Sequence, residues 1–309
     1  MPPNASIADL RATLRRVSEP PFLRGLDRLR FAAQRSVSHR PGATPVARVT
    51  QASGLELAAH KPYAPGDDLR YVDWNALARL DQRVVRTFRA EREAPLHLLL
   101  DASASMGSPL ADGKLAFAAG LAASLAYIAL RRGSPVRAAV LANASRNISP
   151  MLRHMQRLPE LHAFLAPLTP AGPTHLAEGI EAYLRTTQLP GTAIVLSDFL
   201  LEARAAEGAL DQLRGRGYDV VALRPIGPGE RDASTLPRRL QLRDVETGTI
   251  RDVEMDAAGR HAYAAAVTAH LQHLKTWCEG RDVAFAAPDT AAGVAACLLA
   301  DLPRIGVLQ

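Results

Sequence analysis

The sequence predicts an α/β protein whose core is a mostly parallel β-sheet with helices on both faces. From Ala94 onward, short apolar runs alternate with helical segments, which is typical of parallel strands joined by crossover helices. Runs such as Leu96–Leu100 are almost continuously apolar, as strands buried on both faces are. The chain has 309 residues, of which 48% are hydrophobic and 22% charged, so it can form a large core.

Residues 1–93 are predicted to form a separate N-terminal segment. Leu and Phe recur at helical spacing between residues 10 and 29, which predicts an amphipathic helix. Residues 46–93 are rich in turn-forming residues, and residues 83–89 alternate as an exposed strand does. The sequence leaves open whether this segment is a domain of its own or adds strands to the sheet.

Residues 94–309 are predicted to form the sheet domain. Strands are expected over the short apolar runs 96–100, 135–142, 146–148, 192–196, 219–224 and 282–286. Helices are expected over the longer segments 109–132, 152–165, 174–187, 202–215 and 257–278. A β-hairpin insertion is expected near 238–256, where two runs flank Glu246-Thr247-Gly248.

Composition and hydropathy exclude several classes of protein. Two cysteines, Cys278 and Cys297, exclude a disulfide framework and are expected to be buried thiols. The strongly apolar uncharged run Leu115–Leu130 has 16 residues and predicts a buried helix, because a membrane span needs roughly 20 apolar residues. No apolar segment precedes the first arginines, so we expect no secretory signal and a cytoplasmic protein. His97 is expected to be a core residue of the first strand.

The positive charge is confined to the N-terminal third. Residues 1–94 contain 16 Lys and Arg against 10 Asp and Glu, whereas residues 95–309 contain 21 of each. A nucleic-acid interface needs a clustered basic face, but these arginines are interleaved with acidic residues and aromatic residues make up only 5%. Nucleic-acid binding is therefore the weakest of the functions considered, and no nucleic-acid partner is expected.

Oxygen-bearing side chains stand near the carboxyl ends of the predicted strands, where ligands of open parallel sheets bind. These candidate ligands are Asp101, Ser103, Ser105, Thr174 and Asp198. They offer only hard oxygen donors, which Mg²⁺ prefers, with Mn²⁺ and Ca²⁺ as alternatives. Two carboxylates only neutralise such an ion, so it can still accept a carboxylate from outside. The alternative is a polar loop in which Thr174 and Asp198 cap helices.

A second motif, Gly107 to Lys114, resembles a phosphate-binding loop. However, five residues rather than four separate its glycines, and Leu115 stands where a hydroxyl residue is required. We therefore reject ATP binding at this loop.

The order Asp101-x-Ser103-x-Ser105, then Thr174, then Asp198 resembles the metal-ion-dependent adhesion site of von Willebrand factor A domains. The resemblance implies a von Willebrand factor A-like, Rossmann-type sheet. It also implies that these residues hold Mg²⁺, and that a Glu or Asp of a bound protein completes the coordination shell.

Motifs upstream of this site, and one downstream of it, resemble a bacterial family, the fifty-eighth domain of unknown function, which is usually encoded beside MoxR-type AAA+ ATPases. They are Tyr63-Ala-Pro65-Gly66-Asp67-Asp68-x-Arg70-x-x-Asp73-Trp74, Ala78-Arg79, Phe88-x-x-Glu91 and Asp244-x-Glu246-Thr247-Gly248. Leu77 and Lys61 depart from the family pattern. The resemblance implies a non-enzymatic, Mg²⁺-dependent adaptor or co-chaperone that acts with a MoxR-type ATPase in assembly or maturation of client proteins.

The sequence allows an alternative function and a second candidate surface. A metal-dependent hydrolase or phosphatase with Asp101 or Ser103 as nucleophile is the alternative function, although the chain has no Gly-x-Ser-x-Gly elbow. Six residues of the N-terminal segment could form a partner-binding surface, or they could form a turn that holds this segment against the sheet. They are Asp67, Asp68, Arg70, Asp73, Trp74 and Arg79.

Overall fold

The computed structural model describes residues 3–32, 56–63, 72–89, 94–107, 113–141, 147–187, 189–232, 234, 236–243 and 248–309. The chain divides into two compact units. We call residues 1–37 with 94–309 the sheet unit, and residues 38–93 the insert unit. The expected N-terminal segment 1–93 is therefore divided, because its first 37 residues belong with the sheet.

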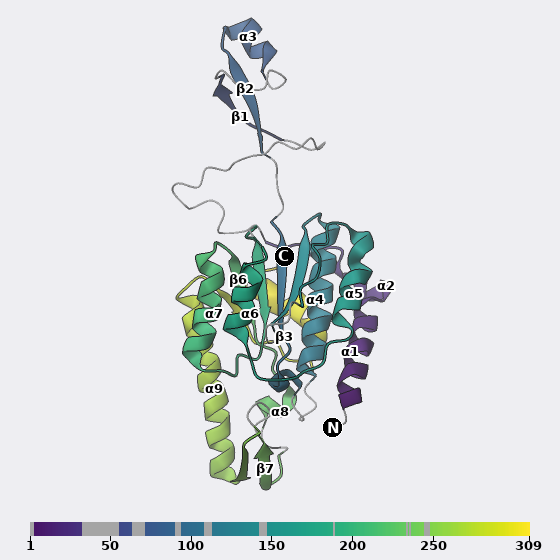
Figure 1. Ribbon diagram of the computed structural model, residues 1–309, viewed down its shortest axis with the longest axis vertical. Helices are drawn as coiled ribbons and strands as arrows, with labels where there is room; N and C mark the ends of the chain where they lie inside the picture. Colours follow the sequence, from purple (N-terminus) through teal and green to yellow (C-terminus); the bar gives the residue numbers. More distant parts are fainter. Residues whose placement is uncertain are drawn as a thin grey trace. The chain divides into compact units, whose positions relative to one another are not determined.

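Five parallel strands form the centre of the sheet unit, in the order β4-β3-β5-β6-β9 (Figure 1). They are β3 (Leu96–Asp101), β4 (Val136–Leu141), β5 (Thr192–Leu196), β6 (Asp219–Leu223) and β9 (Ala284–Ala286). Leu98 and Leu100 enter the apolar core on one face of the sheet, and Leu99 enters the core on the other. The predicted α/β class with a mostly parallel, doubly buried sheet is thus confirmed.

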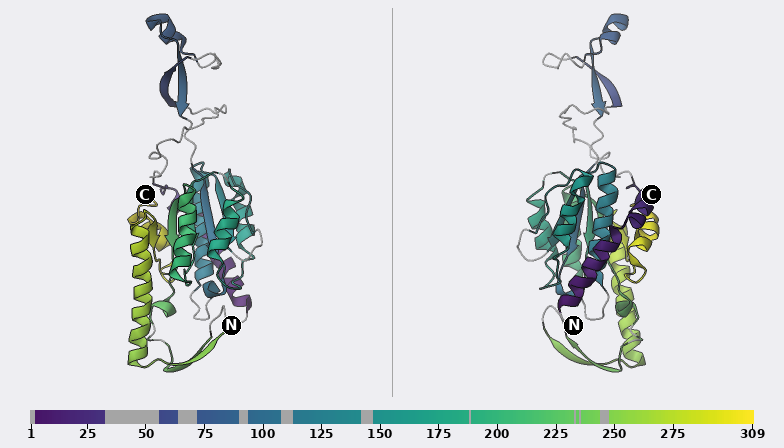
Figure 2. Two further views of the ribbon diagram at one scale, coloured as in Figure 1. Left: turned by 60° about the vertical axis from the view of Figure 1, so that its left-hand side comes forward. Right: turned by 90° about the vertical axis from the view of Figure 1, so that its right-hand side faces the viewer.

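Helices cover both faces of this sheet (Figure 2). One face carries α1 (Pro3–Val17), α2 (Pro20–Leu26), α4 (Lys114–Arg131) and α5 (Leu158–Leu165), and the other carries α6 (Leu176–Leu184), α7 (Ala203–Gly215) and α9 (Ala257–Glu279). By length and composition α4 could cross a membrane, but 89% of it is buried in the sheet unit. This confirms the buried helix expected over Leu115–Leu130.

The N-terminal helices belong to the sheet unit for two physical reasons. Leu10, Leu14 and Val17 of α1 are buried in the core beside α4. The chain after α2 also pairs with the C-terminus: Arg30 N donates to Gln309 O at 3.0 Å, and Gln309 N donates to Arg30 O at 2.9 Å.

Three short helical turns that the sequence did not predict precede this C-terminus: α10 (Gly293–Ala296), a π-helical turn (Cys297–Asp301) and α11 (Leu302–Arg304).

Other expected elements are shifted or differ in kind. Residues 146–148 do not form the expected separate strand in the described part of the chain. Instead, residues 147–152 run antiparallel to the edge strand β4 through isolated bridges, such as Ile148 with Ala139. The helix expected from residue 152 begins only at Leu158, after a 3₁₀ turn at Met155–Arg157.

Two antiparallel hairpins complete the chain. In the sheet unit, β7 (Arg239–Arg243) and β8 (Ile250–Glu254) confirm the insertion predicted near 238–256, and the short α8 (Pro228–Arg231) precedes them. In the insert unit, β1 (Glu56–Pro62) pairs with β2 (Val84–Arg89). The helix α3 (Trp74–Leu80) lies between β1 and β2 in the chain and was not expected.

Gly191, at the start of β5, lets the backbone of this strand approach the backbone of Pro95 closely. A Cβ added there would collide with the backbone carbonyl of Pro95, whereas a Cβ at Gly208 on α7 would meet nothing within 4 Å. We expect Gly191→Ala to lower the unfolding free energy by about 1–3 kcal/mol. Gly208→Ala should instead raise it by up to about 1 kcal/mol, since alanine favours the helix. Urea unfolding of both variants checks this pair, and equal effects would contradict it.

Candidate metal-binding site

Two aspartates lie at the carboxyl edge of the sheet. Asp101 is the last residue of β3, and Asp198 lies two residues beyond the end of β5. β3 and β5 are neighbours, and the strand order reverses between them, because β4 lies on one side of β3 and β5 on the other. Open α/β sheets bind ligands at such a switch point. Both aspartates are 0% exposed, so their charges need local compensation.

Asp101 fixes the loop that follows β3. Its Oδ1 accepts a hydrogen bond from the backbone N of Ser103 at 2.8 Å, and its Oδ2 accepts one from the hydroxyl of Ser197 at 2.6 Å. Burial raises the pKa of Asp101 to about 6, although the hydrogen bonds from Ser197 and Ser103 oppose that rise. Both carboxylate oxygens are therefore engaged within the protein. Ser197 had no sequence signal for this role beyond its place before Asp198.

The two serines of the motif extend toward Asp198. Ser103 Oγ and Ser105 Oγ are 2.9 Å apart, and Ser105 Oγ donates to Asp198 Oδ1 at 3.4 Å. Asp198 Oδ1 also accepts from Leu200 N at 3.3 Å. Ser105 lies in the 3₁₀ turn η2 (Ala104–Gly107), in which Ser105 and Met106 are buried. Ser103 and Ser105 from the loop after β3 thus converge with Asp198 from the loop after β5.

Thr174 lies in the adjacent loop. Ala171 N donates to Ala102 O at 2.9 Å, and Ala104 N donates to Gly172 O at 2.8 Å, so this loop is fastened to the one after β3. Thr174 itself is half-buried. The residue at the N-cap of α6 is His175, and the residue at the N-cap of α7 is Glu202. Neither Thr174 nor Asp198 is therefore the helix cap that the alternative interpretation required.

A buried group of charges that the sequence analysis did not predict adjoins Asp198. Lys114 Nζ lies 3.6 Å from Asp198 Oδ2 and 2.6 Å from Glu230 Oε2, and Arg224 also pairs with Glu230. Burial alone would raise the pKa of Glu230, but Arg224 and Lys114 hold it below its usual range. We call Lys114, Arg224 and Glu230 the buried charge cluster. The available signal was Lys114 at the start of a helix in a chain with only three lysines.

The donor set suits a hard cation. Within the described ranges, no three His, Cys, Asp or Glu residues gather as a metal-holding group. The site instead combines two carboxylates with hydroxyls, which are oxygen donors of the kind Mg²⁺ accepts. Asp198 Oδ2 is buried and has no hydrogen-bond partner among the described residues. A buried carboxylate with one oxygen free of hydrogen bonds, beside Ser103 and Ser105, fits a cation, which these three residues would hold with Asp101 as their support.

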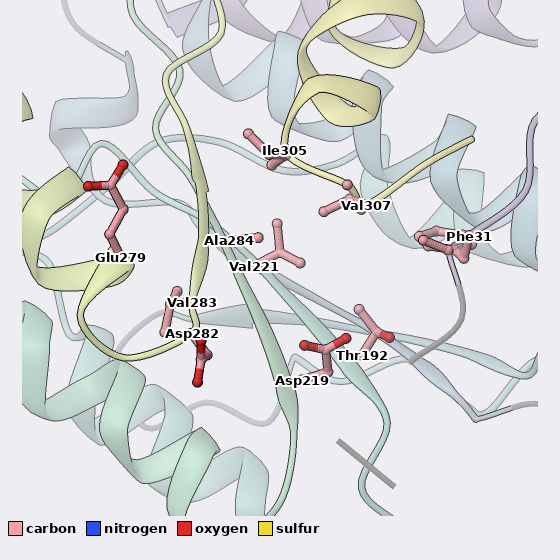
Figure 3. A pocket seen from close by; sticks show the side chains of 12 residues that line it. Phe31, Thr192, Asp219, Val221, Glu279, Asp282, Val283, Ala284, Ile305 and Val307 are labelled. Atoms are coloured by element: carbon pink, nitrogen blue, oxygen red, sulfur yellow. The ribbon is translucent and has the colours of Figure 1, made fainter. Parts of the chain in front are cut away.

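Two cavities of the sheet unit lie near different ends of the strands. A cavity of about 240 Å³ lies at the amino ends of the strands, where Thr192 and Asp219 begin β5 and β6 (Figure 3). It is remote in the sheet from the carboxyl edge that carries Asp101. Another cavity, of about 420 Å³, adjoins the candidate site at Ala102 and Ala171 and has Phe164 in its wall.

The predicted partner-binding surface is only partly described. Asp67, Asp68 and Arg70 lie outside the described residues. Asp73 caps α3, because its carboxylate accepts from the backbone N of Asn75 at 3.0 Å and of Ala76 at 3.1 Å. Trp74 and Arg79 are exposed, and Trp74 has 58% of its surface accessible.

Cys278, Cys297 and His97 lie where the sequence predicts them. Both cysteines are free and buried. His97 is fully buried in β3, where its Nδ1 lies 2.5 Å from the Tyr183 hydroxyl.

Comparison with known proteins identifies relatives. Uncharacterized proteins of Mycobacterium tuberculosis (strain ATCC 25618 / H37Rv), Rv1480, and of Mycobacterium bovis, Mb1516, are 29% identical over 227 residues. The matched region covers 70% of this chain and 69% of each relative.

Solved structures also match. The conserved hypothetical protein BatB from Bacteroides thetaiotaomicron is 17% identical, with a TM-score of 0.38, over 60% of this chain and 99% of its own. An aerotolerance-related membrane protein from Bacteroides fragilis, carrying multiple mutations to serine, is 17% identical, with a TM-score of 0.40, over 69% and 98%.

The family model described as "Protein of unknown function DUF58" matches residues 59–273. This match includes β3, β5 and both aspartates of the candidate site, and it agrees with the family that the sequence motifs resemble. Because the match spans more than half of the chain, the chain belongs to the DUF58 family.

Proposed function

We propose that the sheet unit is a Mg²⁺-dependent protein-binding module and not an enzyme. The observation that carries this proposal is the convergence of Ser103, Ser105 and Asp198, in which Ser105 reaches Asp198 Oδ1 while Asp198 Oδ2 has no hydrogen-bond partner among the described residues. Hydroxyls add no charge to a bound divalent ion, so the ion keeps affinity for a further oxygen ligand. The carboxylate of a Glu or Asp on a partner protein is the ligand that fits this requirement.

The fold supports a von Willebrand factor A-like assignment. If the edge segment 147–152 is counted as the third strand, the chain follows the doubly wound order 3-2-1-4-5-6. The candidate site then lies at the switch point between the first and fourth strands. The position of the Thr174 loop beside the Ser103 loop also agrees with the five-residue ligand set of that adhesion site.

A MoxR-type AAA+ ATPase is the partner that we propose, together with a client protein that offers an acidic side chain. The family resemblance supports the ATPase, and the cavity beside Ala102 gives room for residues that flank an incoming carboxylate. The chain would act as an adaptor or co-chaperone in assembly or maturation of the client, in the cytoplasm. ATP hydrolysis would belong to the partner.

The hydrolase alternative has less support. A nucleophilic aspartate needs a free oxygen facing the substrate, but both oxygens of Asp101 accept hydrogen bonds inside the protein. A nucleophilic serine needs an adjacent base. Ser103 Oγ lies 2.9 Å from the hydroxyl of Ser105, and the neighbouring carboxylate of Asp101 already accepts from Ser103 N and from the Ser197 hydroxyl.

Removal of both hydroxyls tests the proposal without changing the charge of the site. We expect Ser103→Ala/Ser105→Ala to weaken Mg²⁺ binding more than about tenfold, since even indirect ligand contacts contribute tenfold or more. The double variant should also lose Mg²⁺-dependent capture of a purified MoxR-type ATPase. Titration calorimetry measures the first effect and a pull-down with and without EDTA the second.

Ser124→Ala is the matched control, because Ser124 is a buried serine whose hydroxyl bonds Gly120 O within α4. It should bind Mg²⁺ and the ATPase as the wild type does. Equal capture by all three proteins, unaffected by EDTA, would refute the proposal. Turnover of a generic phosphate ester by the purified wild type would instead revive the hydrolase.

A further inference from the structure

We infer that Lys114 is a tethered counter-ion of the candidate site, so that its ammonium and a divalent cation compete for Asp198. The inference rests on the proposed function, because it requires Asp198 to take part in metal binding. Its basis is geometric: Lys114 Nζ lies 3.6 Å from Asp198 Oδ2, which has no hydrogen-bond partner among the described residues, and 2.6 Å from Glu230 Oε2.

The position of Lys114 is unfavourable for a cation on two counts. Lys114 is the first residue of the 18-residue helix α4, and the N-terminus of a helix favours negative charge. Its side chain is also only 3% exposed, so the charge is removed from water. The carboxylates of Asp198 and Glu230 offset these costs. Without a metal, Lys114 therefore supplies the positive charge that Asp198 requires.

The backbone fixes where this side chain begins. Gly113, which precedes α4, has a φ of 58°, a left-handed conformation that favours glycine. Gly113 O accepts from Phe117 N at 2.8 Å and so starts the helix. From this anchored position, the flexible stem of Lys114 lets the ammonium shift between the two carboxylates. A metal at Asp198 would move the ammonium toward Glu230, which it already contacts.

Charge balance explains why such a lysine would matter for partner binding. The region holds three carboxylates and two cations, which leave one negative charge when all are ionised: Asp101, Asp198, Glu230, Lys114 and Arg224. A divalent ion changes this to one positive charge, and the carboxylate of a partner restores neutrality. Lys114 thus weakens binding of the metal alone and favours binding of the metal together with an acidic ligand.

The test is a double-mutant cycle on Mg²⁺ affinity, measured by titration calorimetry on the full chain with Mg²⁺ alone. We expect Lys114→Met to bind Mg²⁺ roughly tenfold tighter than the wild type, or more, because a nearby like charge is removed. Glu230→Gln should bind more weakly, because Lys114 then pairs with Asp198 alone. In Lys114→Met/Glu230→Gln, the second substitution should have little further effect.

A metal-free readout accompanies the cycle. In the absence of Mg²⁺, Lys114→Met should melt below the wild type, because Asp198 and Glu230 lose a counter-ion. Addition of Mg²⁺ should then raise its Tm by more than it raises that of the wild type. Lys275→Met, which removes an exposed lysine paired with Glu279, is the control and should match the wild type.

The outcomes separate the inference from the proposed function. If the wild type binds Mg²⁺ and Lys114→Met binds it equally or more weakly, the inference is wrong and the proposed function stands. An equal loss on Glu230→Gln with and without Lys114 would also overturn it, since Glu230 would then act on the metal by itself. If none of the proteins binds Mg²⁺, both fail.

Discussion

Glu230→Gln should lower the free energy of unfolding by about 3–5 kcal/mol, the cost of breaking a buried ion pair from one side. Glu230 pairs with both Lys114 and Arg224, and these two cations are 3% and 1% exposed. Arg224 Nε and Nη1 have no hydrogen-bond partner among the described residues, so the charge of Arg224 depends strongly on Glu230. The substitution would leave Lys114 with Asp198 as its carboxylate and would remove the carboxylate that Arg224 pairs with.

Urea unfolding followed by circular dichroism measures this loss. Glu160→Gln is the matched control, because Glu160 pairs with Arg157 at 2.7 Å in an exposed position. An exposed pair contributes at most about 1 kcal/mol, so this control should be close to the wild type. A triple variant with Lys114→Met, Arg224→Met and Glu230→Leu should recover much of the loss, because apolar residues often replace a buried ion group without cost. Comparable losses for Glu230→Gln and Glu160→Gln would show that the cluster is not closed to water.

The strands of the sheet were predictable because each combines continuous apolar residues with a nearby turn. Thr192–Leu196, for example, is buried on both faces and needs no tertiary context to be recognised as a strand. Short helices were harder to predict, because a helix of one or two turns contains too few residues to show a clear hydrophobic periodicity. The seven-residue α3 and the turns at 293–304 were missed for this reason, although Asp73 is a good N-cap signal for α3.

Some residues of the candidate site could likewise be predicted from the sequence and others could not. Asp101, Ser103, Ser105 and Asp198 were predictable, because the carboxyl ends of parallel strands meet at one edge. Their placement follows from chain order alone. Glu230, from beyond β6, pairs with both Lys114 and Arg224, and nothing in the local sequence specifies those contacts. Groups whose role depends on the three-dimensional packing of charges have no spacing rule, and a sequence pattern therefore cannot assign them.

His97 is expected to make stability depend on pH. Burial lowers the pKa of His97 to about 4, the backbone of Leu189 opposes this, and the charge of Arg137 adds to it. In the unfolded chain its pKa is about 6.5, so the unfolded state binds the proton first as the pH falls. The contribution of His97 is present above pH 6.5 and is lost between pH 6.5 and about 4. This lowering of the pKa from 6.5 to about 4 corresponds to a change of about 3 kcal/mol in the free energy of unfolding.

The difference in unfolding free energy between His97→Gln and the wild type isolates the effect of His97. The wild-type profile alone does not, because Asp101 changes the stability in the opposite direction over nearly the same pH range. The pKa of Asp101 is raised to about 6, so its contribution is lost as the pH rises, and the two slopes partly cancel in the wild type. His97→Gln should therefore gain stability relative to the wild type as the pH falls from 6.5 to 4. Tyr183→Phe removes the hydroxyl 2.5 Å from His97 Nδ1 but keeps the imidazole, so its pH dependence should follow the wild type. Parallel pH profiles for His97→Gln and the wild type, from urea unfolding at each pH, would mean that the buried ring is protonated as easily as in the unfolded chain.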